Sequence, residues 1–163
     1  MSSRPSAPST PRSIAASISS TPHRRTASDH SEEIVGKALA QDQRRERALI
    51  ATKVGLDWRD GNVFRNASAG RVRQEIEDSL KRLRTDRIDL YQVHWPDPRV
   101  PVEQTAAALG ALLEEGKIRA IGVSNFSRRS DDRCFNALRR STRCSRLYNL
   151  FRARHRTRRA PVR

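Results

Sequence analysis

Three short apolar runs alternate with helical patterns between residues 48 and 123, and this alternation restricts the fold most. The runs cover residues 48–52, 88–94 and 118–123, which suits strands buried on both faces. Between them, apolar residues recur at helical spacing, first at Val72, Ile76, Leu80 and Leu83 and then at Val102, Ala106, Leu109 and Leu113. The pattern predicts right-handed parallel β–α–β units, as in a doubly wound sheet or a (β/α)₈ barrel.

Local signals place the ends of these elements. Ser31 is a candidate N-cap, and two glutamates follow it in the positively polarised first turn of a short helix. We expect that helix to bury Ile34, Val35, Ala38 and Leu39. Residues 85–87 read as a turn before the second strand, and Gly116 stands where a left-handed C-terminal cap is expected.

Charge divides the chain into three zones. The chain of 163 residues has 33 Lys and Arg against 18 Asp and Glu, a net charge of +15. Residues 1–30 carry +3, residues 31–125 only +1 and residues 126–163 carry +11, and all four lysines lie in the middle zone. We therefore predict a disordered flank at 1–29, a folded domain at 30–127 and an irregular, arginine-rich tail at 128–163. No run of 18 apolar residues occurs, so the sequence predicts no membrane span.

Three strings lie at or beside the expected strand ends, where α/β enzymes place their catalytic groups. They are Ala51-Thr52-Lys53, IDLYQVHWPDP at 88–98 and GKIRAIGVSNF at 116–126. Together with SLKRL at 79–83 they closely resemble the aldo-keto reductase family, and the resemblance covers residues 31–127.

The resemblance implies a (β/α)₈ barrel that binds NADPH without a glycine-rich loop and transfers hydride to a small aldehyde or ketone. It also implies a cytoplasmic enzyme that needs no metal. By this resemblance Lys53 is the lysine that assists the proton donor, and His94 orients the carbonyl group. Ser124 and Asn125 match the pair that binds the nicotinamide carboxamide, and Trp95 would line the substrate pocket. Taken singly, Lys53 also fits a surface cation, His94 a core histidine, and Ser124-Asn125 a simple turn.

The family's aspartate and proton-donating tyrosine are expected just before Ser31, but residues 13–29 contain no tyrosine. When GC-rich synonymous codons are read one frame on, residues 13–29 become DRRIDLIDTAPAYGFG, which resembles the missing strand. The same shift turns residues 139–146 into APIHAVQS, which resembles the family's next strand. Residues 148–151 are again in the frame that matches the family. When the frame is shifted in the opposite direction, residues 152–158 become ERDIER. We therefore hypothesise a frameshifted member of the family.

This hypothesis predicts a fragment of a barrel, with about three parallel strands, flanking helices and irregular termini. Three strands cannot close a barrel, and the proton donor is missing, so we expect negligible carbonyl reduction. A non-catalytic NADPH-binding or regulatory module is the alternative. An arginine-rich nucleic-acid-binding protein is a remote alternative, because the tail lacks interleaved aromatic residues for base stacking. In the favoured interpretation most of the net charge of +15 results from flanks translated out of frame. Nucleic acid is therefore not expected as a partner.

Overall fold

The computed structural model describes residues 13–17, 25–41, 44–127, 129, 133, 134, 136, 137 and 147–149, and for 13–17, 25–29 and 147–149 only the backbone. Within these residues the centre of the fold is a five-stranded parallel sheet in the order β1-β2-β5-β6-β7. Its strands are β1 (Ser13–Ser17), β2 (Ala48–Val54), β5 (Leu90–Val93), β6 (Ile121–Val123) and β7 (Leu147–Asn149).

The three predicted strands form the middle of this sheet, in the predicted parallel arrangement. A bridge between Ile88 and Ile118 extends the pairing of β5 and β6 towards their N-terminal ends. The outer strands β1 and β7 were not predicted. They fall inside the predicted flanks 1–29 and 128–163, most of which lies outside the described residues.

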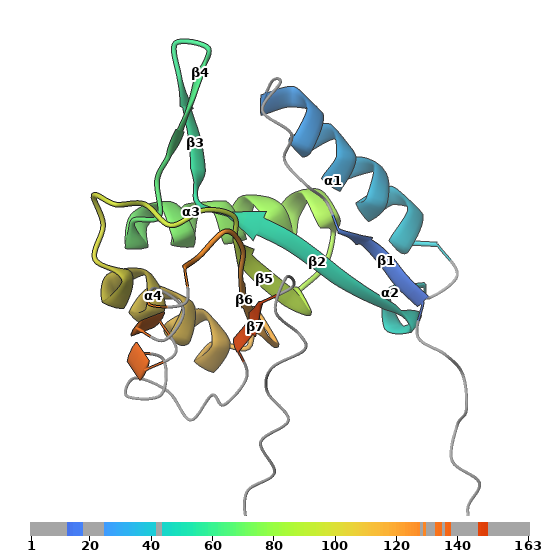
Figure 1. Cartoon of the computed structure of the whole chain (residues 1–163). Helices are drawn as coiled ribbons and strands as arrows, with labels where there is room; N and C mark the ends of the chain where they lie inside the picture. Colours follow the sequence, from blue (N-terminus) through green and yellow to red (C-terminus); the bar gives the residue numbers. More distant parts are fainter. Residues whose placement is uncertain are drawn as a thin grey trace, which may run out of the picture.

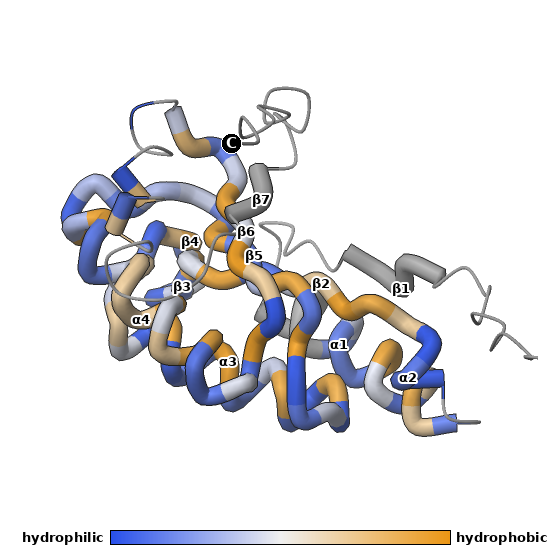
Figure 2. The backbone as a smooth tube through the Cα atoms, turned by 90° about the horizontal axis from the view of Figure 1, so that it is seen from below, coloured by the Kyte–Doolittle hydropathy of each residue, from blue (hydrophilic) through white to orange (hydrophobic). Residues whose placement is uncertain are grey.

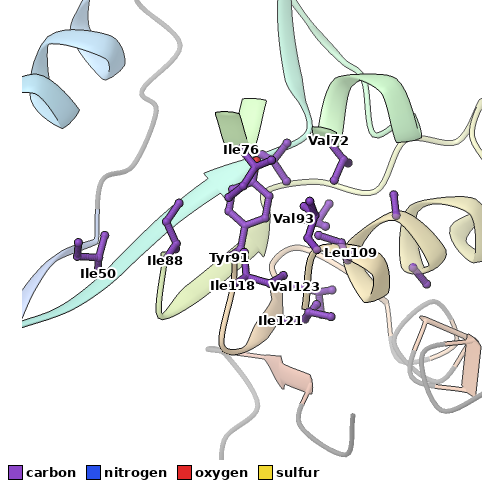
Figure 3. Packing of buried hydrophobic residues seen from close by; sticks show 14 of the residues in the cluster. Ile50, Val72, Ile76, Ile88, Tyr91, Val93, Leu109, Ile118, Ile121 and Val123 are labelled. Atoms are coloured by element: carbon purple, nitrogen blue, oxygen red, sulfur yellow. The ribbon is translucent and has the colours of Figure 1, made fainter. Parts of the chain in front are cut away.

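Helices α1 (Arg25–Leu39), α3 (Ala69–Leu83) and α4 (Val102–Glu114) lie side by side along one face of the sheet (Figures 1 and 2). A single turn, α2 (Arg44–Arg47), leads into β2. The core between the helices and the sheet includes Ile50, Val72, Ile76, Tyr91, Val93, Leu109, Ile121 and Val123 (Figure 3). Alternate residues of β2 are buried, and those between them are only half-buried. The helices therefore cover one face of the sheet, and the other face remains partly open.

Two helices end in the same hydrogen-bonded motif. After α4, Gly116 has a φ of 75°, its N–H bonds to the carbonyl of Leu113, and the next N–H, of Lys117, bonds to that of Leu112. The predicted cap at Gly116 is thus confirmed as a Schellman motif. After α3, Arg84 takes the same left-handed position with a φ of 52°. Arginine pays a steric cost there that glycine does not.

The first helix differs from its prediction. It begins at Arg25, so Ser31 lies inside the helix and does not cap it. Ile34 is 52% exposed and Ala38 is also exposed, contrary to expectation, whereas Leu39 is buried and Val35 partly buried. The inward-facing row instead runs through Glu32, Gly36 and Leu39, at helical spacing. Hydrophobic periodicity missed this face because two of its three positions hold a carboxylate and a glycine.

A β-hairpin that was not predicted stands out from the end of the sheet (Figure 1). It consists of β3 (Leu56–Arg59) and β4 (Asn62–Arg65), joined by Asp60-Gly61. Both turn residues have positive φ, 50° and 77°. The Asp-Gly pair is a recognised signal for this type of turn and could have predicted the hairpin.

Candidate active site at the carboxyl edge of the sheet

All five predicted site residues lie at the carboxyl edge of the parallel sheet. Lys53 is the penultimate residue of β2, His94 and Trp95 follow β5, and Ser124 and Asn125 follow β6. Parallel strands bring their carboxyl ends to one edge, which is where α/β folds place their binding sites. Three segments far apart in sequence thus meet here because of the sheet topology.

Backbone hydrogen bonds fasten the three strand ends together. The N–H of His94 donates to the carbonyl of Val54 at 2.8 Å, and that of Ser124 donates to Val93 at 2.9 Å. Asn125, in the left-handed region with a φ of 60°, donates from Nδ2 to the carbonyl of His94 at 2.8 Å. The hydrogen bond from Asn125 therefore holds the main chain of His94 in place.

Lys53 and His94 are close enough for the charge of one to affect the other. Burial lowers the pKa of the Lys53 ammonium. Burial, and secondly the positive charge of Lys53, lower the pKa of His94. At neutral pH the imidazole is therefore uncharged, with one N–H to donate, which suits a group that orients a carbonyl oxygen. This pairing fits the roles that the family resemblance implies for the two residues.

Ser124 and Asn125 also contact one another. Asn125 Nδ2 lies 3.2 Å from Ser124 Oγ, and Ser124 is almost fully buried while Asn125 is exposed. Since Asn125 Nδ2 serves these two acceptors, its Oδ1 atom is the group suited to accept from a carboxamide. This arrangement is compatible with the role that the family resemblance implies for the pair.

Trp95 contacts both His94 and the hairpin. Its ring centroid lies 6.2 Å from that of His94, and the guanidinium of Arg65, from the hairpin, lies 5.0 Å above the indole. The indole is 37% exposed. Trp95 thus connects the carboxyl edge to the hairpin, a contact that only the tertiary structure reveals.

The proton-donating tyrosine of the family has no counterpart among the described side chains. Tyr91 occupies the same row as Thr52 and Ile121, on the face of the sheet that the helices cover. It is fully buried, and burial raises its pKa well above the usual value. Tyr91 is therefore a core residue that lies on the wrong face to serve His94.

A buried polar cluster behind Lys53 was not predicted. Glu32 of α1, 2% exposed, accepts from Thr52 Oγ1 at 2.7 Å, from Ser79 Oγ at 3.1 Å and from Arg82 Nε at 2.7 Å. Arg82 also bonds to Glu75, at 3.1 Å. The cluster satisfies every oxygen of a buried carboxylate, as stability requires. Because Thr52 precedes Lys53, the cluster holds the end of β2 in place, and this gives a physical role to Ser79 and Arg82 of the SLKRL string.

Asp89 performs a similar task at the opposite end of the strands. Its carboxylate accepts from the N–H of Ile50 at 2.9 Å and contacts Arg45 and Arg119, both at 3.1 Å. Such interactions at the amino end of barrel strands serve stability. The IDLYQVHWPDP string therefore contributes a structural aspartate at one end and His94 at the other.

Neither a metal-binding cluster nor a membrane-spanning helix occurs in the described part of the chain. Within the described residues no group of three His, Cys, Asp or Glu side chains is placed to hold a metal ion. No helix in this part of the chain is long and apolar enough to cross a bilayer.

Comparison with known proteins agrees with this geometry. The sequence model described as "Aldo/keto reductase family" matches residues 27–153. Aldo-keto reductase YhdN of Bacillus subtilis is 53% identical over 121 residues, which are 74% of this chain and 36% of that protein. The NADH-specific methylglyoxal reductase of Escherichia coli is 39% identical over 109 residues, covering 59% of this chain and 33% of that one.

Among solved structures, the glycerol dehydrogenase AKR11B4 from Gluconobacter oxydans superimposes with a TM-score of 0.64 at 44% identity. The match covers 74% of this chain and 37% of that one. The chain thus spans about a third of the length of the relatives it matches. Its parallel sheet with helices on one face corresponds to part of a (β/α)₈ barrel, and the chain belongs to the aldo/keto reductase family.

Proposed function

We propose that this chain derives from an NADPH-dependent reductase of aldehydes and ketones and by itself reduces such compounds negligibly. The observation that carries the proposal is the carboxyl edge, where a neutral His94 stands beside Lys53 while Tyr91 faces the helices. Family membership supports the ancestral chemistry. The relatives' own names include both a methylglyoxal reductase and a glycerol dehydrogenase.

Each residue at this edge has a definite part in the ancestral reaction. Ser124 and Asn125 would hold the carboxamide of a nicotinamide cofactor, which supplies hydride when bound. His94 donates a hydrogen bond to the carbonyl oxygen and so aligns it. As hydride adds, negative charge builds on that oxygen and must be neutralised by a positioned acid. Lys53 assists such an acid electrostatically, but residues 13–29 supply no tyrosine.

The expected deficit follows from this missing group. A positioned general acid contributes about 10²–10⁴-fold to the rate. The loss of cofactor contacts would lower the rate further, because the matched region is about a third of the relatives' length. We therefore expect turnover to be indistinguishable from background.

The test uses the purified full chain with methylglyoxal or glyceraldehyde, and either NADPH or NADH. Both cofactors are needed because one relative is named as NADH-specific. We expect no loss of absorbance at 340 nm above the rate without protein. Turnover that is proportional to protein concentration and abolished by Lys53→Met would contradict the proposal. Tight binding of NADPH without reduction would instead favour a non-catalytic cofactor-binding module.

The second part of the proposal concerns the origin of the arginine-rich flanks. We propose that residues 13–29 and 139–146 are translated out of the ancestral frame. The family match begins at residue 27 and ends at residue 153, a range that is consistent with residues 30–127 and 148–151 keeping the ancestral frame. The coding DNA decides the matter. GC-rich codons that yield the shifted strings are expected, and codons incompatible with them would exclude a frameshift.

A further inference from the structure

A cavity of about 520 Å³ lies beside the predicted site, between the hairpin and the loop that joins β5 to α4. None of the five predicted site residues lines it. Ala67, Thr105 and Phe126 lie against it but are buried, so they expose little surface to a ligand. Apolar contact comes instead from Pro98, Val100 and Pro101 of the loop, which are exposed or half-buried.

Among the described residues, the charged side chains around the cavity are three arginines and one aspartate. Arg133 is bound to Glu103 through contacts of 2.9 to 3.1 Å. Arg99 is bound to Asp97, and hydrogen bonds from Arg99 outweigh burial and lower the pKa of Asp97. The aspartate therefore stays ionised and fully engaged. These four described side chains together carry a net positive charge.

Arg65 differs from the other two arginines. Its guanidinium stacks over Trp95 at 5.0 Å and donates to the carbonyl of Pro96 at 3.3 Å, yet no carboxylate in the described part of the chain pairs with it. A planar guanidinium held on an aromatic face keeps donors free for a bidentate anion.

The amino end of α4 opens onto the same cavity. Pro101 and Val102 line it, and Pro101, at the N-cap, provides no side-chain hydrogen bond to the first turn. First-turn N–H groups and the helix dipole favour a negative charge at this position. The first turn already contains the carboxylate of Glu103, which Arg133 binds, so the sign of the ligand charge rests mainly on Arg65.

We propose that this cavity binds a small organic carboxylate, with the carboxylate on Arg65 and its apolar body on Pro98, Val100 and Pro101. A guanidinium that no described carboxylate pairs with suits a monoanion, and the apolar side chains of the loop suit a hydrocarbon body more than a free inorganic ion. Ligand binding at this site requires neither a cofactor nor turnover. The proposal can therefore be tested independently of the proposed reductase ancestry.

The test measures binding of benzoate to the full chain by calorimetry or ligand-observed NMR. Benzamide, of the same shape but uncharged, is the matched ligand, and we expect it to bind about five- to tenfold more weakly. Arg65→Gln should weaken benzoate binding by a similar factor. Arg59→Gln is the matched protein control, because Arg59 also lies on the hairpin over an aromatic ring, Phe64, but does not line the cavity.

Far-UV circular dichroism is the control for folding. We expect both variants to keep the wild-type fold, because both replaced residues are exposed on the hairpin. Equal affinity for benzoate and benzamide would overturn the proposal. So would an Arg65→Gln protein that binds benzoate like the wild type, or an equal loss in Arg59→Gln. Inorganic phosphate that binds more tightly than benzoate would overturn the assignment to a carboxylate.

Discussion

Gly36 allows α1 to approach α3 closely, and replacing it with alanine should destabilise the protein. A β-carbon at Gly36 would lie 2.3 Å from the carbonyl oxygen of Arg82 and 2.8 Å from the carbonyl carbon of Leu83, whereas such contacts almost never fall below 3.0 Å. The obstacle is backbone, so α1 must withdraw by about 0.7 Å, the difference between the shortest contact and that limit.

This withdrawal would stretch the contacts of Glu32 with α3. Ser79 Oγ and Arg82 Nε now lie 3.1 Å and 2.7 Å from its carboxylate, so the first bond would break and the second weaken. Overpacking costs about 1–3 kcal/mol and a weakened charged hydrogen bond about 1 kcal/mol more. The higher helix propensity of alanine returns about 1 kcal/mol. We expect Gly36→Ala to lose about 2 kcal/mol of unfolding free energy.

Urea denaturation followed by circular dichroism at 222 nm measures this change. Gly70→Ala is the matched control, because Gly70 also lies in a helix but has no atom within 4 Å of its would-be β-carbon. We expect that variant to gain up to about 1 kcal/mol. A Gly36→Ala protein that unfolds at the same or a higher urea concentration than the wild type would refute the reasoning.

Three further outcomes are expected. Arg84→Gly should raise the unfolding free energy by about 0.5–1 kcal/mol in the same urea assay, because glycine accepts the left-handed cap without strain; no gain would contradict that account. Lys53→Met should raise the pKa of His94 in an NMR titration, since a nearby positive charge disappears while burial remains; an unchanged pKa would show that the two side chains do not interact. Burial raises the pKa of Glu75 in the folded protein above 4.5, so the folded state holds the Glu75 proton more tightly than the unfolded state does. The stability that this proton contributes is fully present below pH 4.5 and is lost as the pH rises through the raised pKa. Glu75→Gln should therefore weaken this decline in stability with rising pH, whereas Glu33→Gln, at an exposed position, should keep it.

The contrast between α1 and α3 shows where hydrophobic periodicity succeeds and fails. In α3 the buried positions include Val72, Ile76 and Leu83, so the apolar spacing located the helix. In α1 the inward row includes Glu32 and Gly36, and the pattern selected the exposed Ile34 instead. A carboxylate is buried there only because three donors from two other elements meet it. Those donors come from β2 and α3, so α1 alone carries no sign of them.

The sequence by itself determined the parallel strand–helix alternation, the cap at Gly116 and the family, because each depends on local spacing or on contiguous strings. It also placed Lys53, His94, Ser124 and Asn125 at strand ends. Only the tertiary structure decided that His94 stays neutral beside Lys53, that Trp95 stacks under Arg65 and that Tyr91 faces away from the site. These features depend on strand register and on burial, which arise when segments tens of residues apart pack against one another.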